Sequence, residues 1–499
     1  MIWLTLLALL PLVGGIAAGV VKGSAGRAVG LVVSLATLAL AAFVGLLYLS
    51  GRSLAEQVVW IRALGAYYAL DLDGLGLLMV LLTALLVPVV LVAERPRDDE
   101  GRWSGSTFTA LVLVLESLAL YVFLAADVLL FYIVFEATLI PMYFLVAGWG
   151  GPRRAQAALK FLLYSLAGGL VMLFGVIGLG YVSAQQGPAS YLLADLAHLG
   201  VGGWLQTAMF WSFFIAFAIK APMVPVHTWL PSTAEQATPG TSTLLVGILD
   251  KIGTFGMIKF CLVLFPAAST RAAPYIVGLA VLSVLYGALA AIGQRNLFRL
   301  VAFTSVSHFG FMVLGIFAFT TASVQGSAVY MLNHGFSTAV LFLAVGYLAK
   351  RRGSADIGDF GGVILVAPVA AGVLLVGGLA SLSLPGMGSF IGEFLVLAGA
   401  WSRWPWVAAV ASLGMVLAAL YILIMYQRVC TGPVTDQVRD TVRHDLTRLE
   451  RLAMVPVIAL LLLTGFFPKP VLDLVAPVAK QAVASVGMTD PAPAVGGKR

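Results

Sequence analysis

Long apolar runs dominate the chain, and a short polar stretch interrupts each of them. A helix needs about 20 apolar residues to cross the ~30 Å hydrocarbon layer of a membrane. By that measure the chain holds fourteen candidate spans, at about 2–21, 28–49, 74–93, 107–125, 127–148, 159–184, 207–229, 241–265, 274–292, 297–319, 326–349, 363–401, 406–429 and 450–467. The pattern predicts an all-α, polytopic membrane protein that forms one domain over 1–499, with a flexible tail at 489–499.

Composition agrees with a membrane protein. Of the 499 residues, 61% are hydrophobic and 10% are charged. The net charge of +7 resides in short loops, so membrane orientation explains it and no nucleic-acid partner is expected. Cys261 and Cys430 lack metal-site spacing, so we expect no metal and no cofactor on this chain. The first twenty residues lack a charged leading region and a cleavage site, which favours a retained span over a signal peptide.

Lysine and arginine are distributed unevenly between the predicted loops. Odd-numbered loops hold eighteen of them, whereas even-numbered loops hold four, namely Arg52, Arg62, Arg271 and Arg403. Cytoplasmic loops of membrane proteins carry the excess of positive charge. We therefore expect the odd-numbered loops in the cytoplasm and both termini on the non-cytoplasmic side, which requires an even number of spans.

Two predicted spans contain backbone breaks. The stretch IKAPMVPVHTWLP at 219–231 holds three prolines, two of them inside the seventh span. Prolines have no backbone N–H, so a helix here would leave the carbonyls of Ala218 and Ala221 free beside Lys220. Irregular backbone at membrane depth is tolerated only inside protein or beside water, so the break predicts a hydrated site. A second break, SLSLPGMGSFIGEF, precedes Glu393 in the twelfth span.

Nine ionisable residues remain at membrane depth or in the first break once the loop charges are set aside. Each such group costs about 2.5–3.5 kcal/mol at the centre of a span, so groups without a role are rare. Together they predict a polar pathway through the membrane. The strongest candidates are Glu136, Lys220, Lys251, His308 and Glu393, and the weaker ones are Glu116, His227, Lys259 and His334.

A structural role competes with a pathway role for the weaker candidates. Lys259 lies near a helix end, where its side chain could reach the interface. Glu116 could form a hydrogen bond across the bundle, and His334 could be an internally satisfied histidine. His227 could extend a proton chain or cap the break. Asp250 points about 100° away from its lysine neighbour around a helix, and its role stays open.

The spacing of the candidates favours an internal repeat. Glu136 and Lys220 are 84 residues apart, and His308 and Glu393 are 85 residues apart. Discontinuous helices in corresponding places are typical of repeated halves in transporters. We therefore expect two inverted five-helix repeats, each with one discontinuous helix. The expected repeats cover about 107–265 and 274–429.

Six stretches resemble one known family: DVLLFYIVFEATLIPMYFLV, AFAIKAPMVPVHTWLP, LLVGILDKIGTFGMIKF, FTSVSHFGFMVLGI, MLNHGFSTAVLFLAVG and LPGMGSFIGEFLVL. Together they are similar to the antiporter-like subunits of respiratory complex I and the related multisubunit cation/proton antiporters. The likeness covers roughly spans three to thirteen. Glu393 resembles the M branch of the complex I chains, because the sister chains more often carry lysine there. The stretch STAEQATPGTS departs from the family, which commonly has an Asp-Ala-His sequence at that place.

The resemblance implies a proton-translocating membrane-arm subunit of a bacterial NADH:quinone oxidoreductase, located in the inner membrane. Glu136 and Lys220 would form the charge pair of the first half-channel, and Lys251 would be the central relay. His308 would continue the hydrated axis, and Glu393 would lead to the other side. The implied partners are other complex I subunits, especially adjacent antiporter-like chains, and membrane lipids. NADH oxidation would take place on another polypeptide.

A buried charge pair suits proton transfer for an electrostatic reason. A carboxylate and an ammonium ~6 Å apart at an effective dielectric near 20 interact by about 3 kcal/mol, which is roughly 100-fold in proton affinity. Withdrawal or protonation of Glu136 would therefore let Lys220 release a proton toward Lys251.

Three alternative functions compete with that of a proton-translocating complex I subunit. A subunit of a multisubunit Na⁺/H⁺ antiporter would share the fold and motifs, although Glu393 argues against it. A haem-binding electron carrier could use His308 and His334 as axial ligands, which an absorption spectrum would reveal. A purely structural spacer would leave the charges at membrane depth unexplained.

Overall fold

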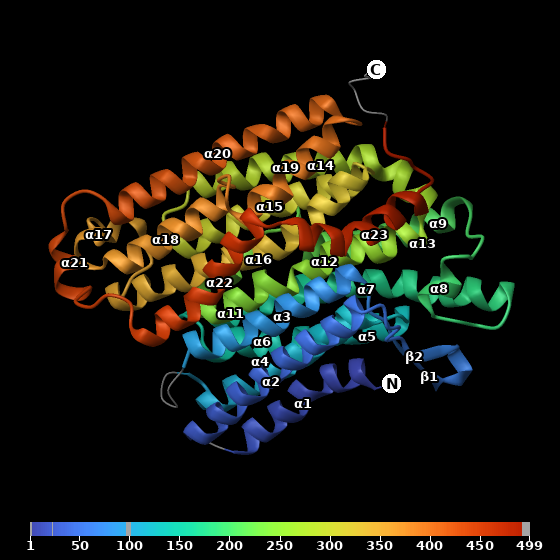
Figure 1. The fold of residues 1–499 in the computed structure, drawn as a ribbon, viewed down its shortest axis with the longest axis horizontal. Coiled ribbons are helices and arrows are strands. Elements are labelled where there is room, and N and C mark those ends of the chain that lie inside the picture. Colours follow the sequence, from blue (N-terminus) through green and yellow to red (C-terminus); the bar gives the residue numbers. More distant parts are fainter. Residues whose placement is uncertain (1, 22, 96–100, 492–499) are drawn as a thin grey trace.

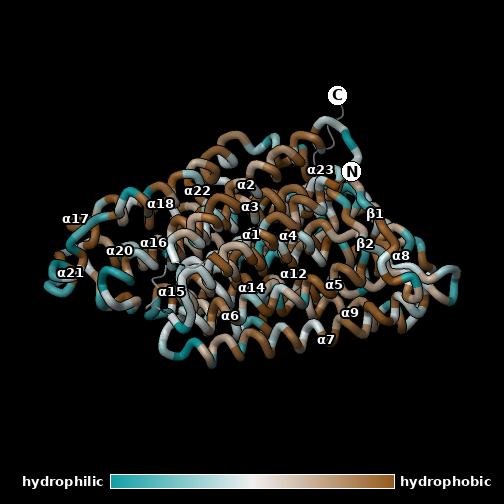
Figure 2. Tube along the Cα trace, turned by 90° about the horizontal axis from the view of Figure 1, so that it is seen from below, coloured by the Kyte–Doolittle hydropathy of each residue, from teal (hydrophilic) through white to brown (hydrophobic). Residues whose placement is uncertain are grey.

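The computed structural model describes residues 2–21, 23–95 and 101–491. Helices run lengthwise through an elongated bundle, with hydrophobic residues along their middles and hydrophilic residues gathered toward the two ends (Figure 1, Figure 2). Within the described ranges, eleven helices are long and apolar enough to cross a membrane. The seventh, eighth and twelfth predicted spans are broken or segmented instead. The predicted polytopic membrane fold is confirmed, and it is mostly helical.

The amino-terminal part contains a β-hairpin that the sequence did not predict. Helices α1 (Trp3–Val20) and α2 (Gly23–Leu49) precede it, and α3 (Gly74–Ala93) follows it. The hairpin pairs β1 (Glu56–Ile61) with β2 (Ala66–Leu70) in antiparallel register around a 3₁₀ turn at Arg62–Leu64. The Glu56 carboxylate accepts hydrogen bonds from the Leu4 and Thr5 backbone amides, which ties the hairpin to the start of α1.

The first predicted repeat contains five helical units. They are α4 (Gly105–Leu124), α5 with α6 (Val128–Ala137 and Leu139–Trp149), α7 (Arg154–Gln186), α9 with α10 (Gly203–Lys220 and Trp229–Gln236), and α11 to α13 (Pro239–Leu244, Lys251–Gly256 and Leu262–Leu264). Short α8 (Leu193–Leu196) lies in the connection before α9. Two π-helical turns, at Leu245–Leu249 and Met257–Cys261, segment the fifth unit.

The second predicted repeat shows the same order of units. They are α14 (Pro266–Ile292), α15 (Leu297–Phe317), α16 (Thr321–Arg352), α18 with α19 (Pro368–Ser381 and Gly388–Trp401), and α20 (Pro405–Cys430). The third helix is long in both sets, with 33 residues in α7 and 32 in α16, and the fourth unit is broken in both. This shared order is what the predicted repeat requires.

The two breaks do not place the charged candidates at equivalent positions. Lys220 is the last residue of the half-helix before the first break, whereas Glu393 lies in the half-helix after the second break. The residue that ends the corresponding half-helix is Ser381. The near-equal spacing of 84 and 85 residues therefore does not reflect matching places in the fold.

The centre of the bundle consists of α15 and α16, whose apolar windows are buried along their whole length. After α20 the chain continues through α21 (Asp436–Thr441), α22 (Arg448–Phe466) and α23 (Lys469–Ser485), and α23 packs on α16 and α3. Short α17 (Val363–Val366) precedes α18. Since α15 and α16 are enclosed on all sides, polar groups on them must find partners inside the protein.

Helix α1 begins and α23 ends at the same end of the bundle, together with the hairpin and α8, while α17 and α21 lie at the opposite end (Figure 1). This placement agrees with an even number of spans. Two residues counted in the loop charges, Lys22 and Arg97, lie outside the described residues.

Most of the predicted tail, 492–499, also lies outside the described residues. The start of that tail is held rather than free. The Thr489 carbonyl accepts a hydrogen bond from Arg403, and the Asp490 carboxylate accepts one from the Thr321 amide, both at 2.7 Å. These two contacts join Thr489 and Asp490 to the bundle, and the flexibility of 489–499 stays a prediction.

Candidate functional site

The five strongest candidates lie on five different helical units, four of them buried and Glu136 partly exposed. Glu136 is on α5, Lys220 ends α9, Lys251 begins α12, His308 is on α15 and Glu393 is on α19. Lys220 is 1% exposed and Lys251 is 0% exposed. Two lysines buried to this degree are rare unless other groups compensate their charge.

Lys220 lies at the first break, where the chain leaves α9. The Trp229 indole N–H donates to the Ile219 carbonyl at 2.9 Å, and the Met223 amide donates to the Ala218 carbonyl at 3.0 Å. The prediction of a free Ala218 carbonyl is therefore wrong, because the chain folds back and caps its own helix end. The segment between α9 and α10 therefore forms a compact turn.

The Lys220 ammonium has no hydrogen-bond partner among the described residues. It lies over two aromatic rings, 5.1 Å from the Phe135 centroid and 5.8 Å from the Phe161 centroid. Aromatic faces stabilise a desolvated cation by about 2 kcal/mol without fixing a proton acceptor. Lys220 therefore keeps its N–H groups available for transfer.

Glu136 is the charged neighbour of Lys220, as predicted, and the two charges interact. The described residues show no direct ion pair between them, and the Glu136 Oε1 atom is buried without a hydrogen bond. On α7 a Cβ atom added to Gly169 would lie 1.7 Å from that oxygen. Only glycine leaves room for the carboxylate in this position.

Asp250 directly precedes Lys251 in the chain and interacts electrostatically with both buried lysines. It is 0% exposed, both carboxylate oxygens lack hydrogen-bond partners within the described chain, and its charge interacts with Lys220 and with Lys251. The sequence left its role open, because helical geometry alone gave its direction and not its neighbours. These interactions link two units of the first predicted repeat, α9 and α12.

Lys251 connects the first predicted repeat to α16. Its ammonium donates to the Val246 carbonyl at 2.7 Å and lies 2.6 Å from the His334 Nδ1 atom. Val246 lies in the first π-helical turn, and such turns frequently occur at functional sites. His334 therefore contacts Lys251 directly and does not lie apart from the strongest candidates.

From His334 the polar series continues through the second repeat. The rings of His334 and His308 meet edge to face with centroids 5.1 Å apart, which leaves no room for a haem between them. The His308 Nε2 atom lies 3.2 Å from the Tyr421 hydroxyl. The charge of Glu393 acts on the hydroxyls of Tyr421 and Tyr330. The sequence missed both tyrosines, whose only signal was a hydroxyl within an apolar helix.

Three weaker candidates lie apart from this series. Glu116 is buried in α4 with both oxygens unpartnered, and the described residues supply no charged group that acts on it. Lys259 forms an ion pair with Asp73, which caps α3, so the structural interpretation fits it. His227 lies in the first break and packs against the Tyr286 ring with centroids 5.1 Å apart.

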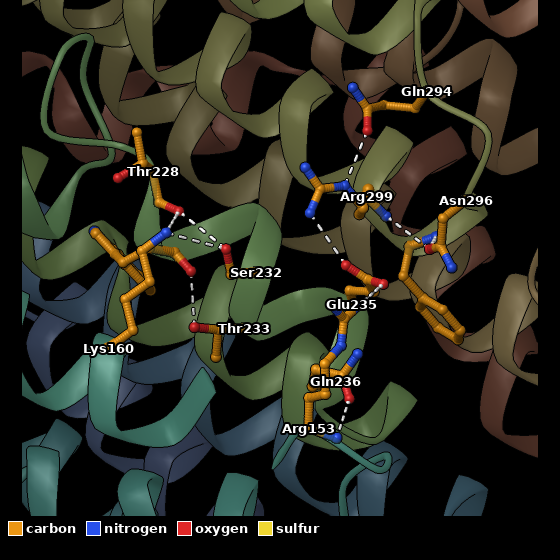
Figure 3. Close-up of polar contacts among 12 residues, drawn as sticks. Arg153, Lys160, Thr228, Ser232, Thr233, Glu235, Gln236, Gln294, Asn296 and Arg299 are labelled. Atoms are coloured by element: carbon orange, nitrogen blue, oxygen red, sulfur yellow. Dashed lines mark hydrogen bonds and ion pairs between the residues drawn. The ribbon is translucent and has the colours of Figure 1, made fainter. Parts of the chain in front are cut away.

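A charged cluster closes one end of the broken helix. Glu235 forms ion pairs with Arg153 at 3.0 Å and with Arg299 at 3.1 Å, and Figure 3 shows it between them. Beside it, the Lys160 ammonium donates to the Thr228 carbonyl at 2.7 Å (Figure 3). Glu235 belongs to the stretch that departs from the family pattern, and here it links α10 to the second repeat.

Glu94 anchors the start of the segmented unit. It follows α3 and accepts hydrogen bonds from the Gly240 amide at 2.8 Å and the Thr238 hydroxyl at 2.9 Å. Burial raises the pKa of Glu94 to about 7, against the opposing effect of these donors and of Lys350. The carboxyl group thereby fixes the beginning of α11, the first helix of the segmented unit that contains Asp250.

Comparisons with known proteins identify relatives along nearly the whole chain. Residues 125–418 match the family model described as NADH:quinone oxidoreductase/Mrp antiporter, TM. The chain is 44% identical over 532 aligned residues to the NADH-quinone oxidoreductase subunit M of Mycobacterium tuberculosis, covering 99% of this chain and 96% of that one.

Solved structures show the same similarity. A chain in the structure of respiratory complex I from Thermus thermophilus with bound NADH has a TM-score of 0.88 and 32% identity, covering 97% of this chain and 100% of that chain. A chain of the Mrp complex from Dietzia sp. DQ12-45-1b has a TM-score of 0.84 and 21% identity over 97% of this chain and 100% of that chain. The second likeness concerns the fold alone.

Proposed function

The chain belongs to the family of NADH-quinone oxidoreductase subunit M, and from this premise we propose that protons cross it along the buried series that begins at Glu136 and ends at Glu393. It is a proton-translocating, antiporter-like membrane subunit of respiratory complex I. The observation that carries the proposed route is continuity: each of the buried ionisable groups along it interacts with the next. The series is Glu136, Lys220, Asp250, Lys251, His334, His308, Tyr421 and Glu393.

The physical basis of transport is alternation of charge. While Glu136 is ionised, its field holds the proton on Lys220, and the Coulomb energy of such a pair is about 3 kcal/mol at a separation of ~6 Å. When redox events elsewhere in the complex withdraw or neutralise that carboxylate, burial favours the neutral amine and the proton moves inward. The transmembrane potential opposes movement of the proton by about 2.3 kcal/mol per charge per 100 mV. This energy is comparable to the Coulomb energy of the charge pair.

The orientation follows from the loop charges. The excess of lysine and arginine in the odd-numbered loops supports placing the end with α17 and α21 in the cytoplasm and both termini outside it, in a bacterial inner membrane. The common end of α1 and α23 agrees with this orientation. In the same proposal, the two five-helix sets are inverted repeats, one for each half of the route.

The partners are other subunits of the complex, above all the adjacent antiporter-like chains. Large apolar side chains are exposed along α7 and α20, such as Leu163 at 55%, Leu170 at 57% and Val416 at 67%. Within a membrane these faces contact lipid or a neighbouring hydrophobic chain. No charged residue of the route lies on them.

Substitution at the first charge pair tests the route. The complete complex with Glu136→Gln or Lys220→Met should oxidise NADH with uncoupler present, yet translocate fewer protons per electron in proteoliposomes. Lys469→Met is a matched control, because that lysine is 83% exposed and pairs only with Asp473. A wild-type proton-to-electron ratio in both pathway variants would exclude the proposed route.

A further inference from the structure

We propose that Asp250 is itself a proton relay: it takes the proton from Lys220 and passes it to Lys251. This inference rests on the proposed route and adds a step within it. The Lys220 ammonium loses a proton to the Asp250 carboxylate, which leaves an amine and a carboxylic acid. The acid then protonates the neutral amine of Lys251, and the carboxylate is regenerated, so charge and protons balance over the two steps.

The first supporting observation is the direction in which Asp250 points. Gly253 follows it by three residues, and residues three apart share a helix face. A Cβ atom on Gly253 would lie 2.5 Å from the Phe217 carbonyl oxygen and 2.6 Å from the Ala221 amide nitrogen. That face therefore packs directly on the end of α9, where Lys220 lies.

Lys251 points the other way. Its ammonium engages His334 of α16 and lies 5.0 Å from the centroid of the Phe309 ring of α15. Both of those helices belong to the second predicted repeat. Two consecutive residues thus face two different halves of the protein, and the π-helical turn at Leu245–Leu249 comes immediately before them.

The second observation is that no donor fixes the Asp250 carboxylate. A buried structural aspartate in the same protein behaves differently: Asp127 accepts hydrogen bonds from the amides of Tyr67, Leu129 and Leu130 at 2.9 Å each. Such donors bind the charged form and hold it. Asp250 has two buried oxygens with no hydrogen-bond donor among the described residues, so either protonation state can form with little rearrangement.

The third observation concerns the two lysines. The described contacts include no hydrogen bond between them, and two ammonium groups repel each other. A carboxyl between them offers an acceptor to one and, once protonated, a donor to the other.

The test uses the complete complex with Asp250→Asn, which keeps the shape and removes the exchangeable proton, and Asp250→Glu, which keeps the carboxyl. Glu116→Gln is the matched control, since it removes an equally buried, unpartnered carboxyl outside the route. Lys251→Met gives the reference for a blocked chain. The measurements are the proton-to-electron ratio in proteoliposomes and the NADH-induced infrared difference spectrum in the carboxylic acid region.

We expect Asp250→Asn to lower the proton-to-electron ratio to that of Lys251→Met, and Asp250→Glu to restore at least half of the difference. A carboxylic acid band should be absent in Asp250→Asn, shifted in Asp250→Glu and unchanged in Glu116→Gln. A purely electrostatic role would lower the ratio and leave that band in place, which would overturn the relay.

A wild-type ratio in Asp250→Asn with a low ratio in Lys251→Met would overturn the relay alone. Wild-type ratios in both would overturn the proposed route as well. If Asp250→Asn fails to assemble, Asp250→Glu decides: an infrared band identical to that of wild type would overturn the relay, and a shifted band would support it.

Discussion

The Nζ atom of Lys251 lies 2.6 Å from the Nδ1 atom of His334, and this contact joins the segmented unit of the first predicted repeat to the central helix of the second. A protonated lysine can only donate, so Nδ1 must accept and the imidazole is neutral with its proton on Nε2. That Nε2 atom is buried and has no hydrogen-bond partner within the described residues. Proton transfer from Lys251 would therefore convert His334 transiently into an imidazolium.

Removing this acceptor should interrupt the route. We expect His334→Leu to slow proton translocation by roughly 5- to 150-fold, because a buried donor left unpaired costs about 1–3 kcal/mol. NADH oxidation in the presence of uncoupler should continue. Ser337→Ala on the same helix is the control, since its hydroxyl contacts only the His334 carbonyl, at 3.2 Å. Equal pumping in His334→Leu and wild type would show that His334 is dispensable.

The space beside Gly169 should control the first charge pair. A methyl group there would meet the Glu136 carboxylate at 1.7 Å, and this flexible side chain would have to turn away from it. We expect Gly169→Ala to reduce pumping about tenfold while assembly is retained. Gly278→Ala, where a Cβ meets nothing within 4 Å, should leave pumping unchanged. If the two variants pump alike, the position of the carboxylate does not matter.

Glu94 should make the start of α11 sensitive to pH. Burial raises its pKa in the folded protein to about 7, whereas an exposed glutamate has its ordinary value near 4.5. The closed state therefore binds more protons than an opened state between these values, and its stability falls as pH rises from about 4.5 to 7. Hydrogen exchange at Gly240 and Thr241, corrected for intrinsic rates, should accelerate over this range.

Glu94→Gln should abolish that acceleration, because the amide does not titrate. The comparison needs wild type and variant at each pH, so that the chemical exchange rate cancels. A variant whose corrected exchange follows the same pH profile as wild type would assign the effect to another group.

Glu235 should stabilise the link between α10 and the second repeat by a small amount. Partly exposed ion pairs contribute about 0.2–1 kcal/mol, and the pair with Arg153 contributes least, because Arg153 is 68% exposed. Glu235→Gln should lower the temperature at which pumping is lost irreversibly, and the difference should shrink at high salt. Asp436→Asn, whose carboxylate is 94% exposed, should change nothing.

Local chemistry accounts for what the sequence predicted correctly. Hydropathy is a local property, so the spans were found, and prolines reveal breaks wherever they remove N–H donors, as at Lys220. The charged candidates were visible because ionisable groups are costly in apolar runs. These signals need no knowledge of which helices touch.

Contacts between distant segments account for what was missed. Tyr421 joins the route because α20 and α15 are neighbours, and nothing near residue 421 indicates that. The sequence indicated only the direction of Asp250 relative to Lys251 and left its role open, because it does not show that α9 packs on the face to which Asp250 points. The hairpin around Arg62–Leu64 depends on Glu56 meeting the start of α1, which is a tertiary contact.

The proton-to-electron ratio of the complete complex with Lys251→Ala tests the central claim most directly, since this lysine is the single junction between the two halves of the buried series. We expect a ratio below that of wild type, with NADH oxidation retained when uncoupler is present. An assembled Lys251→Ala complex that pumps with the wild-type ratio would contradict it.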